Sequence, residues 1–453
     1  MGIYEQLAIP PSSHHLELLN FFHIVSLLVF IPFIGMVFGA SLFSYVFTLI
    51  GRRKRDNKYI RFSKDLLDKL TISRSVGLGV GILPAFSVTF VYAQLLYGAD
   101  VITTGVLFFA CILYSLGFAM LYRFKTTFQV ETIILSMKDY MSNKGTDSEN
   151  LPEDVKKYED KLDESNSKSG RWGFVLMFFA TFLFIGATTL AANPQDWPHV
   201  GNIFAFFING EILINFLYFL ALSMTITGIS ILFFFFIWQG GLKNMTEDYK
   251  KFVQQFGVTL AFLSVMVLLV LMFVKLIYLP QNALSFQVFF YSGLSLLFLV
   301  IVGNLLFAII RNAEIKYVSA AFILMFLVIT FSIINDELVL ANAIKEHVVE
   351  ITAKADEEDQ KKLAAVVTTS DVNAEEIYNT KCIACHKFDQ KLVGPPYNET
   401  VPKYNGNVQK LADFIYSPTK VDAGYPPMPN QGLTKKEATA MAQYLIQQLE
   451  AGK

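Results

Sequence analysis

The sequence contains few of the residues that build metal and redox sites. Its 453 residues include only three cysteines and six histidines. A tetrahedral zinc site needs four such ligands, and this scarcity argues against one. Charged residues are also few, at 17%, whereas 53% of the residues are hydrophobic and 43 are Phe. This composition excludes most of the chain from the water-soluble class and places it among membrane proteins.

Two of the three cysteines stand in one short run, KCIACHK, as Cys382 and Cys385, with His386 directly after them. This C-x-x-C-H spacing is typical of the attachment site of a c-type haem. Thiols three positions apart can both reach the vinyl groups of one porphyrin, and the adjacent histidine is then placed to bind the iron. Half of a zinc site or a redox dithiol are the alternatives, but the nearby sequence offers no second Cys/His pair. The sequence favours one covalent haem c.

The second axial ligand of the iron is predicted to be Met428, in the run GYPPMPN. Prolines on both sides stiffen this loop and fix the direction of the thioether. Met441 is the only other methionine after the motif, and it falls in a predicted helix. His347 is a further candidate, but it lies in a charged segment well before the motif. The alternative for Met428 is an ordinary loop methionine.

Residues 369–453 resemble a class I cytochrome c over nearly their whole length. A short helix leads into the motif, Gly394 and Pro395 follow it, and the last predicted helix begins at the capping box of Thr434 and Glu437. In this family the proline carbonyl orients the proximal histidine, so the resemblance implies that Gly394 and Pro395 belong to the haem environment. His–Met ligation implies a relatively positive potential and electron transfer, with little room for oxygen chemistry.

The rest of the chain predicts an all-α, polytopic membrane helix bundle. Apolar runs long enough to span a bilayer number about eight. They cover residues 18–50, 72–97, 101–121, 172–192, 211–238, 256–278, 285–309 and 317–334. We therefore expect a membrane helix bundle over 1–335, a charged helical linker over 336–368 and the cytochrome c domain over 369–453.

Charge predicts the orientation of these spans. Residues 51–75 are rich in Lys and Arg, and residues 123–171, 243–251 and 311–316 also carry them. The alternate loops and the first 17 residues have none. By the positive-inside rule, the N-terminus and the haem domain face away from the cytoplasm. We expect a multi-pass protein of the bacterial inner membrane, with its haem domain on the periplasmic face and its first span retained, since no cleavage site is evident.

A second redox site would need histidines within the membrane. Only His23 lies clearly within a span, so a b-type haem has few possible ligands. The first half of the chain nevertheless resembles subunit I of cytochrome bd quinol oxidases, in residues 21–33 around His23, in 191–198 and in 224–228. The resemblance makes His23 the one haem-ligand position that could persist. An ordinary hydrogen-bonded histidine is the alternative.

The departures from that family are substantial. Phe219 stands where the family has a haem-ligating histidine, residues 101–121 lack a carboxylate, and residues 279–284 replace a long quinol-binding loop. The sequence therefore favours a monohaem electron-transfer subunit of a respiratory or photosynthetic membrane complex over a stand-alone catalyst. Its expected partners are other membrane subunits and a cytochrome or oxidase, with quinone and lipid as further candidates and no nucleic acid. The alternative is a bd-like quinol-oxidising subunit with a fused c-type haem.

Overall fold

In the structure, a computed structural model, all regular secondary structure of the described residues is helical. The structure describes residues 11–143, 153–242, 245–312, 315–368, 372–420 and 424–450, and no strand occurs among them. The chain divides into two compact units, Met1–Ala353 and Lys354–Lys453. We call them the membrane unit and the C-terminal unit. The predicted domain limits at residues 1, 369 and 453 lie outside the described residues.

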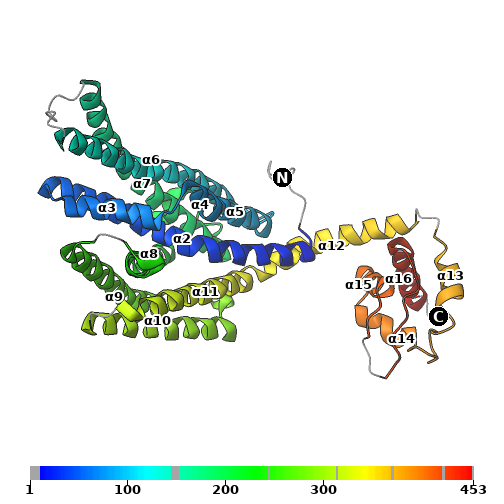
Figure 1. The fold of residues 1–453 in the computed structure, drawn as a ribbon. Coiled ribbons are helices and arrows are strands. Elements are labelled where there is room, and N and C mark those ends of the chain that lie inside the picture. Colours follow the sequence, from blue (N-terminus) through cyan, green and yellow to red (C-terminus); the bar gives the residue numbers. More distant parts are fainter. Residues whose placement is uncertain are drawn as a thin grey trace. The chain divides into compact units, whose positions relative to one another are not determined.

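The membrane unit is a bundle of long helices (Figure 1). Eight helical segments of its described residues are long and apolar enough to cross a membrane, so the predicted number of spans is confirmed. The helices are α2 (Ser13–Lys54), α3 (Asn57–Leu70), α4 (Arg74–Val76), α5 (Leu83–Leu95), α6 (Thr103–Asn143), α7 (Glu153–Ala191), α8 (Gly210–Phe236), α9 (Glu247–Ile277), α10 (Phe286–Asn312) and α11 (Val318–Ala343). The division between the two units falls within the next helix, α12 (Lys345–Thr368). A π-helical turn, Gly77–Ile82, joins α4 to α5.

Two of these helices continue well beyond the apolar runs that predicted them. α6 extends past residue 121 to Asn143, and α7 begins at Glu153 rather than at residue 172. The two helices pack against each other, and Figure 1 shows them extending together beyond the neighbouring helices of this unit. An apolar run marks the part of a helix that lies in lipid, whereas the backbone hydrogen bonds of the helix can continue through polar sequence.

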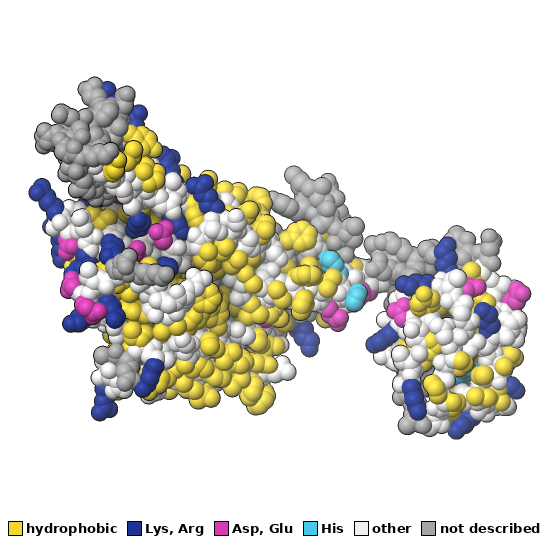
Figure 2. All heavy atoms as spheres, in the orientation of Figure 1, with side chains coloured by type: hydrophobic (Ala, Val, Ile, Leu, Met, Phe, Trp, Pro, Cys, Tyr) yellow, Lys and Arg dark blue, Asp and Glu magenta, His cyan; other side chains and the backbone are white. Residues whose placement is uncertain are grey.

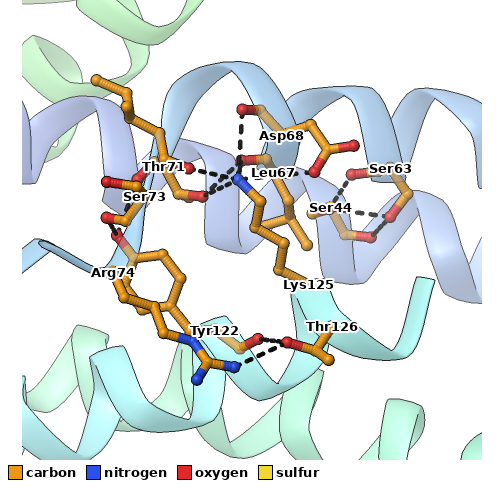
Figure 3. Close-up of polar contacts among 11 residues, drawn as sticks. Ser44, Ser63, Leu67, Asp68, Thr71, Ser73, Arg74, Tyr122, Lys125 and Thr126 are labelled. Carbon is orange, nitrogen blue, oxygen red and sulfur yellow. Dashed lines mark hydrogen bonds and ion pairs between the residues drawn. The ribbon is translucent and has the colours of Figure 1, made fainter. Parts of the chain in front are cut away.

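The basic segment after the first span contains a helix that the sequence analysis did not predict. In α3 the residues Phe62, Leu66, Leu67 and Leu70 are buried and face α2 and neighbouring helices. Figure 3 shows how polar groups fasten this helix. Lys125 donates from Nζ to the carbonyl oxygens of Leu67 at 3.2 Å and Asp68 at 3.3 Å in the last turn of α3, and to that of Ile72, just beyond it, at 2.7 Å. A cation at the C-terminus of a helix satisfies carbonyls that have no partner within the helix.

Glycines allow three of the central helices to approach closely. A Cβ at Gly39 in α2 would overlap the side chain of Thr227 in α8. One at Gly228 in α8 would lie 2.7 Å from the carbonyl oxygen of Gly257 in α9. Small residues at such crossings are the usual means by which membrane helices pack. Gly228 thus lets α8 approach the backbone of α9, whereas Gly39 makes room in α2 for the side chain of Thr227.

The surface of the membrane unit is divided by residue type. Figure 2 shows hydrophobic side chains over the body of the bundle and Lys and Arg side chains gathered at the end where α3 lies. The basic residues there include Arg52, Arg53 and Lys54 in the last turn of α2. An apolar band next to a basic end is the distribution that a bilayer and the positive-inside rule require.

The C-terminal unit is small and has its own hydrophobic core. Its helices are α13 (Ala374–Ile377), α14 (Tyr397–Thr400), α15 (Val408–Tyr416) and α16 (Lys435–Glu450), with a π-helical turn at Tyr378–Cys382. α16 packs against α13 and α15. The predicted capping box begins it, because the backbone nitrogen of Glu437 donates to Thr434 Oγ1 at 3.3 Å and that of Thr434 donates to Glu437 Oε2 at 2.7 Å.

Candidate haem site

The C-x-x-C-H run follows directly from a capped helix. Asn373 caps α13 by accepting from the backbone nitrogen of Glu376 at 3.2 Å, and the chain then winds through the π-helical turn to Cys382. The backbone nitrogens of Cys385 and His386 both donate to the carbonyl of Cys382, at 3.1 and 3.0 Å. This single turn keeps the two cysteines and the histidine close together. The position of the motif near a helix end is the one that the sequence predicts.

The His386 ring is held in one orientation. Its Nδ1 lies 2.8 Å from the carbonyl oxygen of Pro395. Because a carbonyl only accepts, Nδ1 carries the proton and the lone pair is on Nε2, as a metal ligand requires. The ring also stacks on Tyr397, with centroids 5.0 Å apart.

Gly394 leaves the space that this ring occupies. A Cβ at residue 394 would lie 2.7 Å from both Nδ1 and Nε2 of His386, so any larger residue would displace the imidazole. The backbone nitrogen of Gly394 donates to the carbonyl of Cys385 at 2.8 Å. The structure therefore places Gly394 and Pro395 against the imidazole ring of His386.

The first cysteine faces the core of the unit, whereas the second is half-buried. Cys382 is 7% exposed, and its sulfur lies 3.6 Å from the sulfur of Met441. Burial raises the pKa of the Cys382 thiol, and a hydrogen bond with Tyr397 lowers it in part. The core around Cys382 is otherwise apolar and includes Leu411, Ile415, Leu433, Ala438, Ala442 and Leu445. Apolar walls, two thiols and an oriented imidazole fit a covalently held porphyrin.

Met428 lies half-buried in the irregular segment before α16. Two contacts fasten this segment to the chain on either side of the motif. Lys391 Nζ lies over the Tyr425 ring, 4.5 Å from its centroid. Lys381 Nζ donates to the carbonyl of Gln431 at 3.2 Å. These contacts hold the Met428 loop near Cys382 at one end and near Gly394 at the other. The role of Met428 as a ligand of the iron stays a prediction.

His23, the predicted second site, is fully buried in α2. Its Nδ1 lies 2.9 Å from Glu337 Oε2 in α11, and the Tyr92 ring meets it edge to face at 5.1 Å. Among the described residues Nε2 has no hydrogen-bond partner. Glu337 was missed by the sequence analysis, where it fell in the predicted linker. The acidic pair directly after the last apolar run was the available signal.

Phe219, which the sequence analysis expects at the place of a haem-ligating histidine, is buried in α8 and meets Phe38 edge to face. The other histidines of the first half differ from His23, since His14, His15 and His199 are exposed. Among the described residues His23 is therefore the one histidine of that half buried within a span. A ligand role for it stays a prediction.

Residues of the C-terminal unit match known proteins. A family model for cytochrome c matches residues 372–448. The cytochrome c-551 of Azotobacter vinelandii is 36% identical over 77 residues, which are 16% of this chain and 93% of that protein. The cytochrome c-551 of Pseudomonas denitrificans is 33% identical over 76 residues, again 16% of this chain and 93% of the relative. The cytochrome c-552 of Hydrogenobacter thermophilus is 35% identical over 69 residues, 14% of this chain and 69% of the relative.

Proposed function

The chain belongs to the cytochrome c family through its residues 372–448, and on that premise we propose that it is an electron-transfer subunit of a respiratory or photosynthetic membrane complex. Covalently attached haem c and electron transfer follow from the family. Eight apolar helices make the chain a multi-pass membrane protein. The proposal adds that the haem domain works on the periplasmic side of a bacterial inner membrane.

The residues of the C-terminal unit each have a distinct task in this proposal. Cys382 and Cys385 hold the porphyrin through thioethers, and His386 binds the iron through Nε2. Pro395 keeps the imidazole in the required tautomer and raises its basicity by accepting from Nδ1. Met428 would bind the iron as its second protein ligand. Bound haem c supplies a one-electron carrier, whose potential His–Met ligation makes relatively positive.

The observation that carries the proposal is the 2.8 Å contact between His386 Nδ1 and the Pro395 carbonyl, directly beside the two cysteines. A redox dithiol would not need an imidazole fixed in this way, and among the described residues no group of three or more His, Cys, Asp or Glu side chains is placed to hold a zinc ion. A pyridine haemochrome spectrum of the purified protein tests it. We expect the absorption of haem c alone, retained on the polypeptide after acid–acetone extraction. Loss of all iron porphyrin on extraction would reject the proposal, and additional b-type haem would favour the bd-like alternative.

Replacing Met428 tests the electron-transfer role directly. Met428→Ala should retain covalent haem but lower its midpoint potential, since the iron loses a thioether that favours the reduced state. Electron transfer to an external cytochrome or oxidase should fall while the complex still assembles. Met441→Leu is the matched control, because it alters a buried methionine of the same unit at nearly constant volume. Unchanged potential and turnover in Met428→Ala would show that Met428 is not the ligand.

The gathering of Lys and Arg at the α3 end supports the proposed orientation. Fusion of alkaline phosphatase after residue 453 should give an active enzyme, because that enzyme folds only outside the cytoplasm. Fusion within the segment between α6 and α7 should give an inactive one. The reverse pattern would refute the periplasmic assignment of the haem domain.

A further inference from the structure

The membrane unit encloses a cavity that the haem domain does not use. It measures about 140 Å³ and lies among the ends of α7, α8, α9 and α11 and the first half of α2. An apolar cavity of about 150 Å³ holds one benzene ring. The space is therefore the size of a single six-membered ring.

The walls of this cavity are mainly apolar. Leucine, isoleucine and phenylalanine side chains contribute most of them, from Leu27, Ile31, Phe184, Phe219, Leu222, Ile329 and Ile333. Small-molecule sites in proteins have this character, with a few polar groups that set the orientation of the ligand. Apolar walls between membrane spans suit a ligand that dissolves in lipid.

One face of α8 supplies much of the polar lining. Glu211, Asn215, Tyr218 and Leu222 follow one another at intervals of four, three and four residues, so they share a side of the helix. Among the described residues the Oδ1 atom of Asn215 is buried without a hydrogen-bond partner. A buried acceptor of this kind is unfavourable unless something donates to it. The amide of Asn215 can both accept and donate.

The ionisable groups at the cavity are already paired. Lys275 Nζ lies 2.6 Å from Asp336 Oδ1, and Asn193 donates to Glu211 Oε1 at 2.7 Å. Glu337 is the partner of His23. A charged ligand would have to break one of these contacts in a medium where unpaired charge is costly. The Asn215 amide, by contrast, favours a neutral ligand group that forms hydrogen bonds with it.

We propose that this cavity binds the ring of a membrane quinone or quinol, with a ring oxygen at Asn215. A quinone is neutral, flat, soluble in lipid and of one-ring width, and its oxygens accept or donate hydrogen bonds according to its redox state. The quinol hydroxyl matches the unpartnered Oδ1, and the quinone carbonyl matches the amide nitrogen. This binding site goes beyond the electron-transfer role of the haem domain.

Binding is measured on the full-length, haem-loaded protein in nanodiscs of synthetic phospholipid free of quinone. Equilibrium dialysis with decylubiquinone should give saturable binding of one molecule per chain. Decanol, which has a chain but no ring, should not compete. Binding that never saturates, or that decanol displaces equally, would show partition into lipid and overturn the proposal.

Variants test the position of the ring. Asn215→Leu should weaken quinone binding about tenfold or more, and Ile329→Phe should abolish it by filling the cavity. Asn215→Ser keeps a hydroxyl and should bind better than the Leu variant, which separates the hydrogen bond from any loss of folding. Asn304→Leu is the matched control, because Asn304 is exposed on α10 and bonds only within its own helix. Equal affinity in all four variants would place the quinone elsewhere or leave the cavity to water.

These outcomes are independent of those for the haem. The haemochrome spectrum and the redox titration of the same preparations report the haem site alone. Failure of quinone binding with an intact haem c signal would reject the cavity proposal and leave the proposed electron-transfer function in place.

Discussion

Replacing Gly394 with alanine should disturb the histidine side of the haem site. The new Cβ would lie 2.7 Å from two ring nitrogens of His386, so the imidazole must tilt away. Overpacking of this kind costs about 1–3 kcal/mol, and loss of the Nδ1–H···O bond to Pro395 adds about 1 kcal/mol. We expect the C-terminal unit to lose about 2–4 kcal/mol, which is a large part of the total stability of a typical domain.

The assay is guanidinium unfolding of the full-length, haem-loaded protein, followed by the haem absorption band, with the midpoint potential measured in parallel. Gly406→Ala is the matched control. Gly406 has φ +74 and no neighbouring atom within 4 Å, so alanine there meets only the cost of left-handed backbone, about 1–2 kcal/mol. Both variants should be destabilised, but only Gly394→Ala should shift the potential. If the two variants had the same potential as the wild type, the argument that Gly394 makes room for the ligand would be wrong.

Three further predictions concern stability. The backbone N–H of Thr434 lowers the pKa of Glu437. This carboxylate therefore stabilises the fold at pH values above its ordinary pKa of 4.5, and the stabilisation is lost as the pH falls through the lowered pKa. Glu437→Gln should unfold more easily than the wild type at pH 7, and the difference should vanish in acid. Lys125→Met removes a donor that the carbonyls of Leu67, Asp68 and Ile72 share and the cation that pairs with Asp68, and it should cost about 1–3 kcal/mol, seen as a lower melting temperature in detergent. Gly39→Val should force α2 away from Thr227 at a similar cost of about 1–3 kcal/mol, and a normal melting temperature would contradict the close packing described here.

The sequence predicted those features whose signals are local. Cys382, Cys385 and His386 lie within five consecutive residues, and one turn of backbone is enough to bring them together. The number of spans follows from apolar runs, because lipid imposes a minimum length on each. The roles of Gly394 and Pro395 came from the family resemblance, and the contacts of His386 with both residues give that prediction its physical reason.

The features that the sequence did not predict depend on packing between distant segments. His23 and Glu337 are 314 residues apart, and their pairing requires α2 and α11 to be neighbours, which periodicity alone cannot show. The cavity beside Asn215 has the same origin, since six helices contribute to its walls. The sequence analysis missed the helix α3 for another reason. Its many Lys and Arg residues suggested a loop, whereas the spacing of Phe62, Leu66 and Leu70 was that of an amphipathic helix.

The crossing of α8 and α9 restricts how this sequence can change. A Cβ at Gly228 would lie 2.7 Å from the backbone nitrogen of Ala261 and from the carbonyl oxygen of Gly257, so a methyl group there pushes the two helices apart at their crossing. Homologues with a larger residue at position 228 should therefore differ in the spacing of α8 and α9, and in the shape of the cavity that α8 lines, as a single linked change.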